Sequence, residues 1–125
     1  MDRQNVLAEN PVEQGRGFMP AVSVNPSSGQ VAWDANGTIV GQGDIGAQAR
    51  QVFQNLRRVL QAAGSDLSHL LKITTYITKI EDFPAVAEVR SSVFQGELPA
   101  STLIVVKSLF HPDFLLEVEG VAVTV

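Results

Sequence analysis

The chain has 125 residues, of which 45% are hydrophobic and 18% are charged. This composition is typical of a single globular domain, expected over residues 1–125, and excludes an intrinsically disordered chain. The formal net charge of −4 argues against a nucleic-acid partner, because such a surface requires clustered Lys and Arg. The chain has no cysteine, so disulfides and thiolate chemistry are excluded.

The first 15 residues are polar and are expected to form a loosely ordered arm. They contain no apolar segment of the kind that a signal peptide requires. No apolar run in the chain approaches the roughly 20 residues of a membrane-spanning helix. The expected location is therefore the cytoplasm, without a membrane partner.

Short strands and turns are expected before the first helix. A strand is predicted over Phe18–Val24, and a turn rich in Asn, Pro and Ser follows over Asn25–Gly29. Two further short strands are predicted over Gln30–Trp33 and Thr38–Val40. The turn between them, Asp34–Gly37, ends in Asn-Gly, which is a strong hairpin signal.

A long amphipathic helix is expected from about Ile45 to Ala63. Asp44 is placed to cap its first turn by accepting hydrogen bonds from backbone amides, and Gly64 is typical of the position just after a helix end. Apolar residues recur at helical spacing and predict one buried stripe, formed by Val52, Phe53, Leu56, Val59, Leu60 and Ala63.

A strand over Leu70–Thr78 is expected next. Its alternation predicts one face with Leu71, Ile73, Thr75 and Ile77, and a second face with Lys72, Thr74, Tyr76 and Thr78. A second helix is expected to begin at Asp82, because Pro84 is tolerated only in a first turn.

The C-terminal region predicts two strands, Thr102–Val106 and Leu115–Val125. Glu117 and Glu119 alternate with apolar residues in the second strand, and a carboxylate there is either an exposed charge or a site residue. Two helices cover only one face of a mixed sheet, whereas the apolar run Leu103–Val106 predicts that both faces are closed. Self-association is the economical explanation.

Neither histidine predicts a metal site. His69 and His111 have no second His, Cys or carboxylate at ligand spacing. Ser101 lacks a histidine partner and a nucleophile motif, so a plain serine at the start of a strand is a simpler interpretation than a nucleophile.

Motifs in a fixed order along the chain resemble those of the RidA (YjgF) family. These motifs are Ser28-Gly29-Gln30, Asp34–Gly37, Ala47–Gln51, Asn55-Leu56, Ala62–Gly64, Glu81–Phe83, Pro99-Ala100, Lys107, Leu109 and Leu116–Glu119. The resemblance covers roughly residues 15–125. It implies a chorismate-mutase-like α+β fold with two helices on one face of a mixed sheet of five or six strands. It also implies a homotrimer with small-molecule clefts between subunits.

The resemblance implies roles for five residues. Glu119 corresponds to the family's catalytic carboxylate, which orients water during hydrolysis of an enamine or imine. Phe18 corresponds to an aromatic wall of the substrate site, and Gly29 supplies backbone to it. Ser101 stands where the family's deaminases carry an Arg that clamps the substrate carboxylate, and Ser101 and Thr102 are expected to bind a neutral polar ligand.

Three functions remain open on the sequence alone. The first is an enamine or imine deaminase that acts on a non-standard substrate, without the usual α-carboxylate and without a cofactor. The alternative is a non-catalytic trimer that binds or responds to a small ligand; an interaction protein with incidental clefts is a third interpretation. Arg90 is either a substitute cation for the missing Arg or a solvated helix residue.

Overall fold

The computed structural model describes residues 18–21 and 29–123, and side chains are described from Gly29 onward. The predicted arm over residues 1–15 lies outside these ranges. The elements, in chain order, are β1 (Phe18–Ala21), α3 (Ile45–Ala62), the 3₁₀ helix η1 (Leu67–His69), β2 (Leu70–Ile77), the 3₁₀ helix η2 (Ile80–Asp82), α4 (Phe83–Val93), β3 (Ala100–Val105) and β4 (Leu116–Val123).

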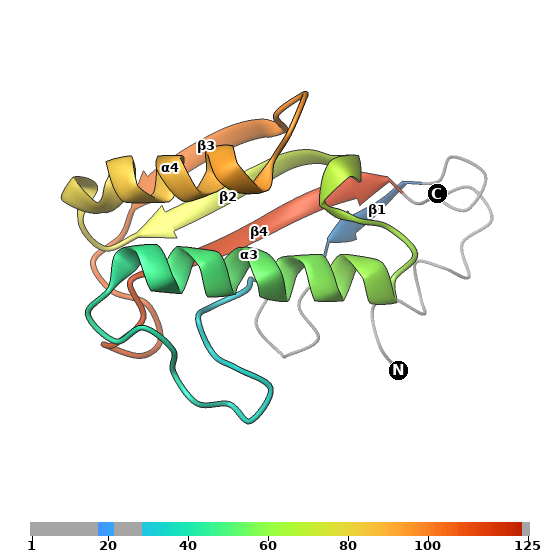
Figure 1. Ribbon diagram of the computed structural model, residues 1–125. Helices are drawn as coiled ribbons and strands as arrows, with labels where there is room; N and C mark the ends of the chain where they lie inside the picture. The colour runs from blue at the N-terminus through green and yellow to red at the C-terminus, as the bar shows by residue number, and fades with distance from the viewer. Residues whose placement is uncertain (1–17, 22–28, 124–125) are drawn as a thin grey trace.

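The two helices lie side by side on one face of a sheet with the strand order β1-β4-β2-β3 (Figure 1). β4 is antiparallel to both of its neighbours, β1 and β2, whereas β2 and β3 are parallel and are connected through α4. The expected α+β fold class, with both helices on one face of a mixed sheet, is confirmed.

The predicted strands Gln30–Trp33 and Thr38–Val40 are wrong as strands, because they contribute only the isolated bridges Gln30–Val118 and Trp33–Ile39. The sheet of the described residues therefore has four strands instead of five or six. The physical reason is a side chain: Asn55 of α3 donates its amide to the carbonyl oxygens of Val31 and Trp33, at 2.9 and 2.8 Å. Those carbonyl groups are therefore directed to the helix.

Helix α3 follows its sequence prediction closely. Asp44 Oδ1 accepts a hydrogen bond from Ala47 N at 3.1 Å, and Gly64 follows the helix end with a φ of +83°. The predicted stripe forms the centre of the core. Ala63 is only half-buried, whereas the other members are fully or nearly fully buried: Val52, Phe53, Leu56, Val59 and Leu60. On the shorter α4, Val86 and Val89 are buried, while Phe83 stays exposed.

The predicted alternation of β2 is wrong at its start. A bulge between Leu70 and Lys72 shifts the register against β4. Leu70 therefore takes the buried position, and Leu71 is 49% exposed. From Ile73 to Ile77 the predicted alternation holds.

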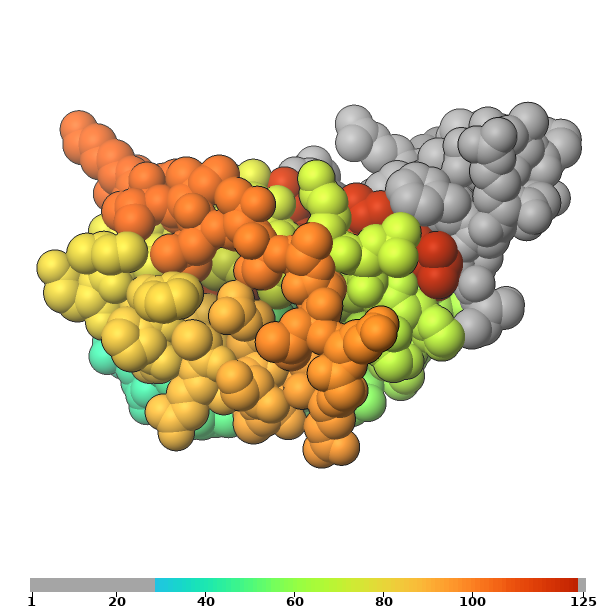
Figure 2. Space-filling view, turned by 90° about the horizontal axis from the view of Figure 1, so that it is seen from above, coloured from blue at the N-terminus to red at the C-terminus, as the bar shows by residue number. Residues whose placement is uncertain are grey.

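The face of the sheet opposite the helices is open in the single chain. Leu116, Val118 and Ala122 of β4 are buried on the helix side, whereas the intervening residues are half-buried. β3 forms one edge of this sheet and carries Ile104 and Val105 at 40% and 49% exposure. Figure 2 views this edge, with the orange residues of β3 at the surface above α4.

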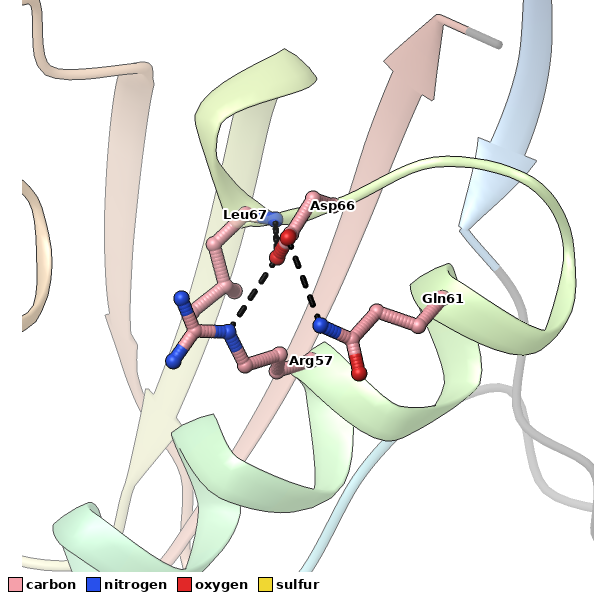
Figure 3. A network of polar contacts seen from close by, with 4 residues as sticks. All are labelled: Arg57, Gln61, Asp66 and Leu67. Atoms are coloured by element: carbon pink, nitrogen blue, oxygen red, sulfur yellow. Dashed lines mark hydrogen bonds and ion pairs between the residues drawn. The ribbon is translucent and has the colours of Figure 1, made fainter. Parts of the chain in front are cut away.

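A polar network holds the connection between α3 and β2 (Figure 3). Asp66 accepts hydrogen bonds from Leu67 N at 2.7 Å, from Arg57 Nε at 3.2 Å and from Gln61 Nε2 at 3.3 Å. Burial raises the pKa of the Asp66 carboxyl, but these three hydrogen bonds and the charge of Arg57 outweigh it, so the net pKa is lowered.

Asp66→Asn tests this network through pH. A lowered pKa in the folded state means that the carboxylate stabilises the fold above its unfolded pKa, and that this contribution disappears as the pH falls through the folded pKa. Because the side chain is partly exposed and screened by solvent, we expect a loss of only about 0.5–1 kcal/mol near neutral pH. Urea unfolding at a fixed protein concentration should show this difference in stability between wild type and Asp66→Asn near neutral pH and none near pH 2. A difference that does not change with pH would show that the charge of Asp66 does not stabilise the fold.

Candidate active site

A pair of carboxylates lies on the open face of the sheet. Glu117 and Glu119 are two residues apart in β4, so both side chains project away from the helices. Both are half-buried. The family resemblance predicted a role only for Glu119, and the structure adds Glu117 to the same surface.

Tyr76 of β2 joins this pair. Its hydroxyl donates a hydrogen bond to Glu119 Oε1 at 2.9 Å. This bond raises the pKa of Tyr76, and burial and the negative charges of Glu119 and Glu117 raise it further. Tyr76 therefore keeps its proton near neutral pH and remains a hydrogen-bond donor to the carboxylate.

The environment of Glu117 favours its protonated form. Burial raises the pKa of the Glu117 carboxyl, and the nearby charge of Glu119 raises it further. Gly29 packs directly against this side chain, because a Cβ built on Gly29 would overlap the Glu117 carboxyl group. Gly29 is thus brought to the carboxylate pair, and its lack of a side chain makes room for Glu117.

The two carboxyl groups have the asymmetry that acid–base catalysis uses. Glu119 is held as an acceptor by Tyr76, while Glu117 retains a proton more readily than an exposed Glu does. Two neighbouring carboxyl groups that differ in burial and in hydrogen-bond partners can act as base and acid in one reaction. Among the described residues, no group of three or more His, Cys, Asp or Glu is placed to hold a metal ion.

Thr102 lies on the same face as Glu119. Thr74 of the central strand pairs with Thr102 on one side and with Glu119 on the other. The three residues therefore form a row across the sheet, with Thr102 and Glu119 roughly 10 Å apart at the usual strand spacing.

Ser101 lies on the opposite face. It pairs with Ile73, whose side chain is buried under the helices, and its hydroxyl accepts a hydrogen bond from Arg90 Nη1 of α4 at 3.0 Å. The structure therefore brings Ser101 to Arg90, and within one chain it does not bring Ser101 to Glu119.

Phe18 is also distant from Glu119 within one chain. It pairs with Val123, four residues beyond Glu119 in β4, a separation of roughly 13 Å along a strand. Only its backbone is described, so its predicted role as an aromatic wall stays a prediction.

Besides Glu117, Tyr76 is a candidate site residue that sequence reasoning missed. The alternation of β2 placed it on the polar face, but the sequence carried no signal that β2 would pair with β4. That pairing sets Tyr76 opposite Glu117 and within reach of Glu119, across 43 residues of chain.

The comparisons with known proteins agree with the fold and with the landmarks. A sequence profile of the family described as Endoribonuclease L-PSP matches residues 16–124. The chain belongs to the RidA family. This RidA-family chain is 34% identical over 96 residues to the 2-iminobutanoate/2-iminopropanoate deaminase of Rattus norvegicus. The matched region covers 77% of this chain and 69% of the rat protein.

Two other relatives extend this comparison. Protein DfrA of Myxococcus xanthus is 37% identical over 97 residues, or 78% of this chain and 73% of DfrA. The solved structure of YyfB from Yersinia pestis, described as a protein of unknown function of the conserved Rid family, has a TM-score of 0.73 at 31% identity. That match covers 85% of this chain and 77% of YyfB. The expected family is therefore confirmed, and its members at this level of identity include proteins named as imine deaminases.

In the part of the chain that the structure describes, neither α3 nor α4 has the length and apolar character of a membrane-spanning helix.

Proposed function

We propose that this RidA-family protein hydrolyses small enamines or imines in the cytoplasm, at sites shared between copies of a homotrimer of single-domain chains. The observation that carries the proposal is the pair Glu117 and Glu119, together with the Tyr76 hydroxyl bound to Glu119. The names of the imine deaminases among the relatives support the same chemistry.

The proposed reaction converts a C=N bond and one water into a C=O bond and ammonia. Glu119 accepts a proton from the water as its oxygen attacks the imine carbon, and Tyr76 holds the carboxylate in place. For an imine, Glu117 donates its proton to nitrogen. For an enamine, it donates that proton to carbon instead, which gives an iminium ion that water attacks directly. The tetrahedral intermediate then collapses: Glu119 gives the proton that it took from water to nitrogen, Glu117 takes up the hydroxyl proton, and the C–N bond breaks to release ammonia. Both carboxyl groups thereby return to their starting states. This sequence needs no cofactor.

A second group of residues supports a site that spans two copies. Arg90 and Ser101 offer a cation and a hydroxyl beside β3, but they lie on the face of the sheet opposite Glu119. One ligand can contact both groups only if they come from different chains. The exposed apolar side chains of Ile104 and Val105 on the same edge strand favour contact with a second copy.

Arg90 also bears on the substrate. Its guanidinium starts from α4, whereas the family resemblance places the clamping Arg on β3, at the position of Ser101. In place of the neutral ligand expected from the sequence, we therefore propose an imine with an anionic group that meets a cation from the helix. Phe18, Gly29 and Thr102 keep their proposed roles in lining this cleft.

Subunit complementation tests the shared site. Glu119→Gln and Arg90→Gln should each lose most turnover in homogeneous assemblies, whose mass should be about three times 13.4 kDa. In an equal mixture assembled together, about a quarter of the sites combine an intact Glu119 with an intact Arg90 from different chains, by random assortment. Turnover in the mixture should therefore recover to about a quarter of the wild-type value. The measurement is semicarbazide trapping of the imines that an oxidase forms from a panel of amino acids.

The matched control is the mixture of Glu119→Gln with the double variant Glu119→Gln/Arg90→Gln. It contains no intact pair and should stay inactive. Mixed assemblies that are verified by native mass spectrometry but are no more active than their parents would refute a site divided between Glu119 and Arg90.

Ligand binding without turnover is the alternative function, and the loss of an Arg at Ser101 favours it. Saturable binding of the imine's keto-acid product by a wild-type trimer that turns over no imine would establish this alternative. The family description "Endoribonuclease" suggests an RNA substrate, but the sequence has a net charge of −4 and the open face carries two carboxyl groups in place of the clustered Lys and Arg that bind phosphates.

A further inference from the structure

A hollow of about 410 Å³ lies on the other side of the molecule, between α3 and the loop that precedes it. Its lining includes Gln30, Trp33, Asp34, Asn55, Arg58 and Val59. Gln30 pairs with Val118, whose side chain faces the helices, so this hollow and the Glu117–Glu119 pair lie on opposite faces of β4. The volume falls in the range of about 300–1,000 Å³ that is typical of small-molecule sites.

Gln30 is the observation that points to a ligand. Its side chain is 5% exposed, and its Nε2 atom has no hydrogen-bond partner among the described residues. A buried amide donor without an acceptor costs free energy, and native structures rarely leave one. An occupant of the hollow that carries an acceptor would supply the missing bond.

The charged groups of the hollow are held in place by their neighbours. Asn55 is fixed by its bonds to the loop carbonyl groups, and its Oδ1 accepts a hydrogen bond from Arg58 Nη2 at 2.9 Å. Arg58 has no carboxylate within 4.0 Å among the described residues. Asp34 uses Oδ1 for two backbone amides, those of Asn36 and Thr38, at 2.9 and 3.0 Å.

We propose that this hollow binds a free α-amino acid with an apolar side chain. The ligand carboxylate accepts hydrogen bonds from the buried Gln30 amide and from Arg58, its ammonium group faces the Asp34 carboxylate, and its side chain packs on Trp33 and Val59. A zwitterion with an apolar side chain matches all the features of the hollow: the Gln30 donor, the positive and negative side chains, and the apolar wall. A simple anion would instead be repelled by Asp34. The inference does not depend on the proposed imine hydrolysis.

Trp33 is the chain's only tryptophan, so its fluorescence reports on this hollow directly. L-leucine should produce a saturable change in Trp33 emission. L-leucinamide lacks the carboxylate and 4-methylpentanoate lacks the ammonium group, so each should bind at least about tenfold more weakly. Equal affinities for all three compounds, or no saturable change with leucine at millimolar concentration, would overturn the proposal.

Variants locate the binding site. Gln30→Leu removes the unpartnered donor at nearly constant volume and should fold, and Arg58→Gln acts on an exposed side chain. Each should weaken leucine binding about tenfold or more, whereas Arg50→Gln removes the same charge from an exposed position elsewhere on α3 and should leave binding unchanged. Leucine binding that both Gln30→Leu and Arg58→Gln leave intact would place the ligand elsewhere and refute the site.

Discussion

Glu119→Gln is expected to lower kcat/KM for imine hydrolysis by about 10²–10⁴-fold, the usual loss when a general base is removed. Gln keeps the size of the side chain and still accepts a hydrogen bond from the Tyr76 hydroxyl, so the fold should be preserved. What it loses is the ability to take a proton from water. The measurement is the rate of semicarbazone suppression with imines formed in situ by an amino-acid oxidase.

Three further variants separate catalysis from structure. Tyr76→Phe removes only the hydrogen bond that orients Glu119 and should cost about tenfold. In the wild type, the rate should decline as the pH rises through the raised pKa of Glu117, because the proposed acid loses its proton. Glu117→Gln removes this acid, so the same decline should be absent from its pH profile. Glu88→Gln changes an exposed carboxylate on α4 and should have no effect. A Glu119→Gln protein as active as Glu88→Gln would rule out Glu119 as the base.

Gln48→Leu is expected to destabilise the protein by about 2–4 kcal/mol, the largest stability effect that we predict for a polar residue. The Gln48 side chain is fully buried in α3. Its Nε2 donates to Asp113 O at 2.8 Å, and its Oε1 accepts from Leu115 N at 2.8 Å. Leucine fills the same space but leaves both backbone groups of the loop before β4 without partners.

The control is Gln54→Leu, an exposed position on the same helix, where the change should stay within about 0.5 kcal/mol. Chemical denaturation of both variants at equal protein concentration gives the comparison. Equal stability of the two variants would show that water replaces the Gln48 side chain at these backbone groups. The Gln48 amide would then not be what holds the loop in place.

Local patterns in the sequence predicted the helices better than the strands. The bounds of α3 follow from Asp44, Gly64 and a stripe at helical spacing, which all act within a few residues. The strand predicted at Gln30–Trp33 failed because the amide of Asn55, more than 20 residues away, binds two of its four carbonyl oxygens, those of Val31 and Trp33. The bulge at Leu70–Lys72 likewise depends on the partner strand, which periodicity does not reveal.

The site divides along the same line. Alternation in β4 and the family resemblance pointed to Glu119, whose role stays a prediction. Tyr76, the contact between Gly29 and Glu117, and the position of Arg90 beside Ser101 all arise from pairings between distant segments. A single sequence contains no signal for such pairings, so these contacts emerged only from the structure, although Gly29, Ser101 and Arg90 were already candidates.

The position of β4 in the sheet has a consequence for folding during synthesis. β4 follows every other described element in the chain, yet it lies between β1 and β2, and its register joins Phe18 to Val123. As the chain leaves the ribosome, α3, β2, α4 and β3 emerge before the strand that joins β1 to them. Long-range pairings of this kind form late and slowly. The carboxylates Glu117 and Glu119 therefore arrive with the last strand to be synthesised, and in a nascent chain the proposed site stays incomplete until the sheet is complete.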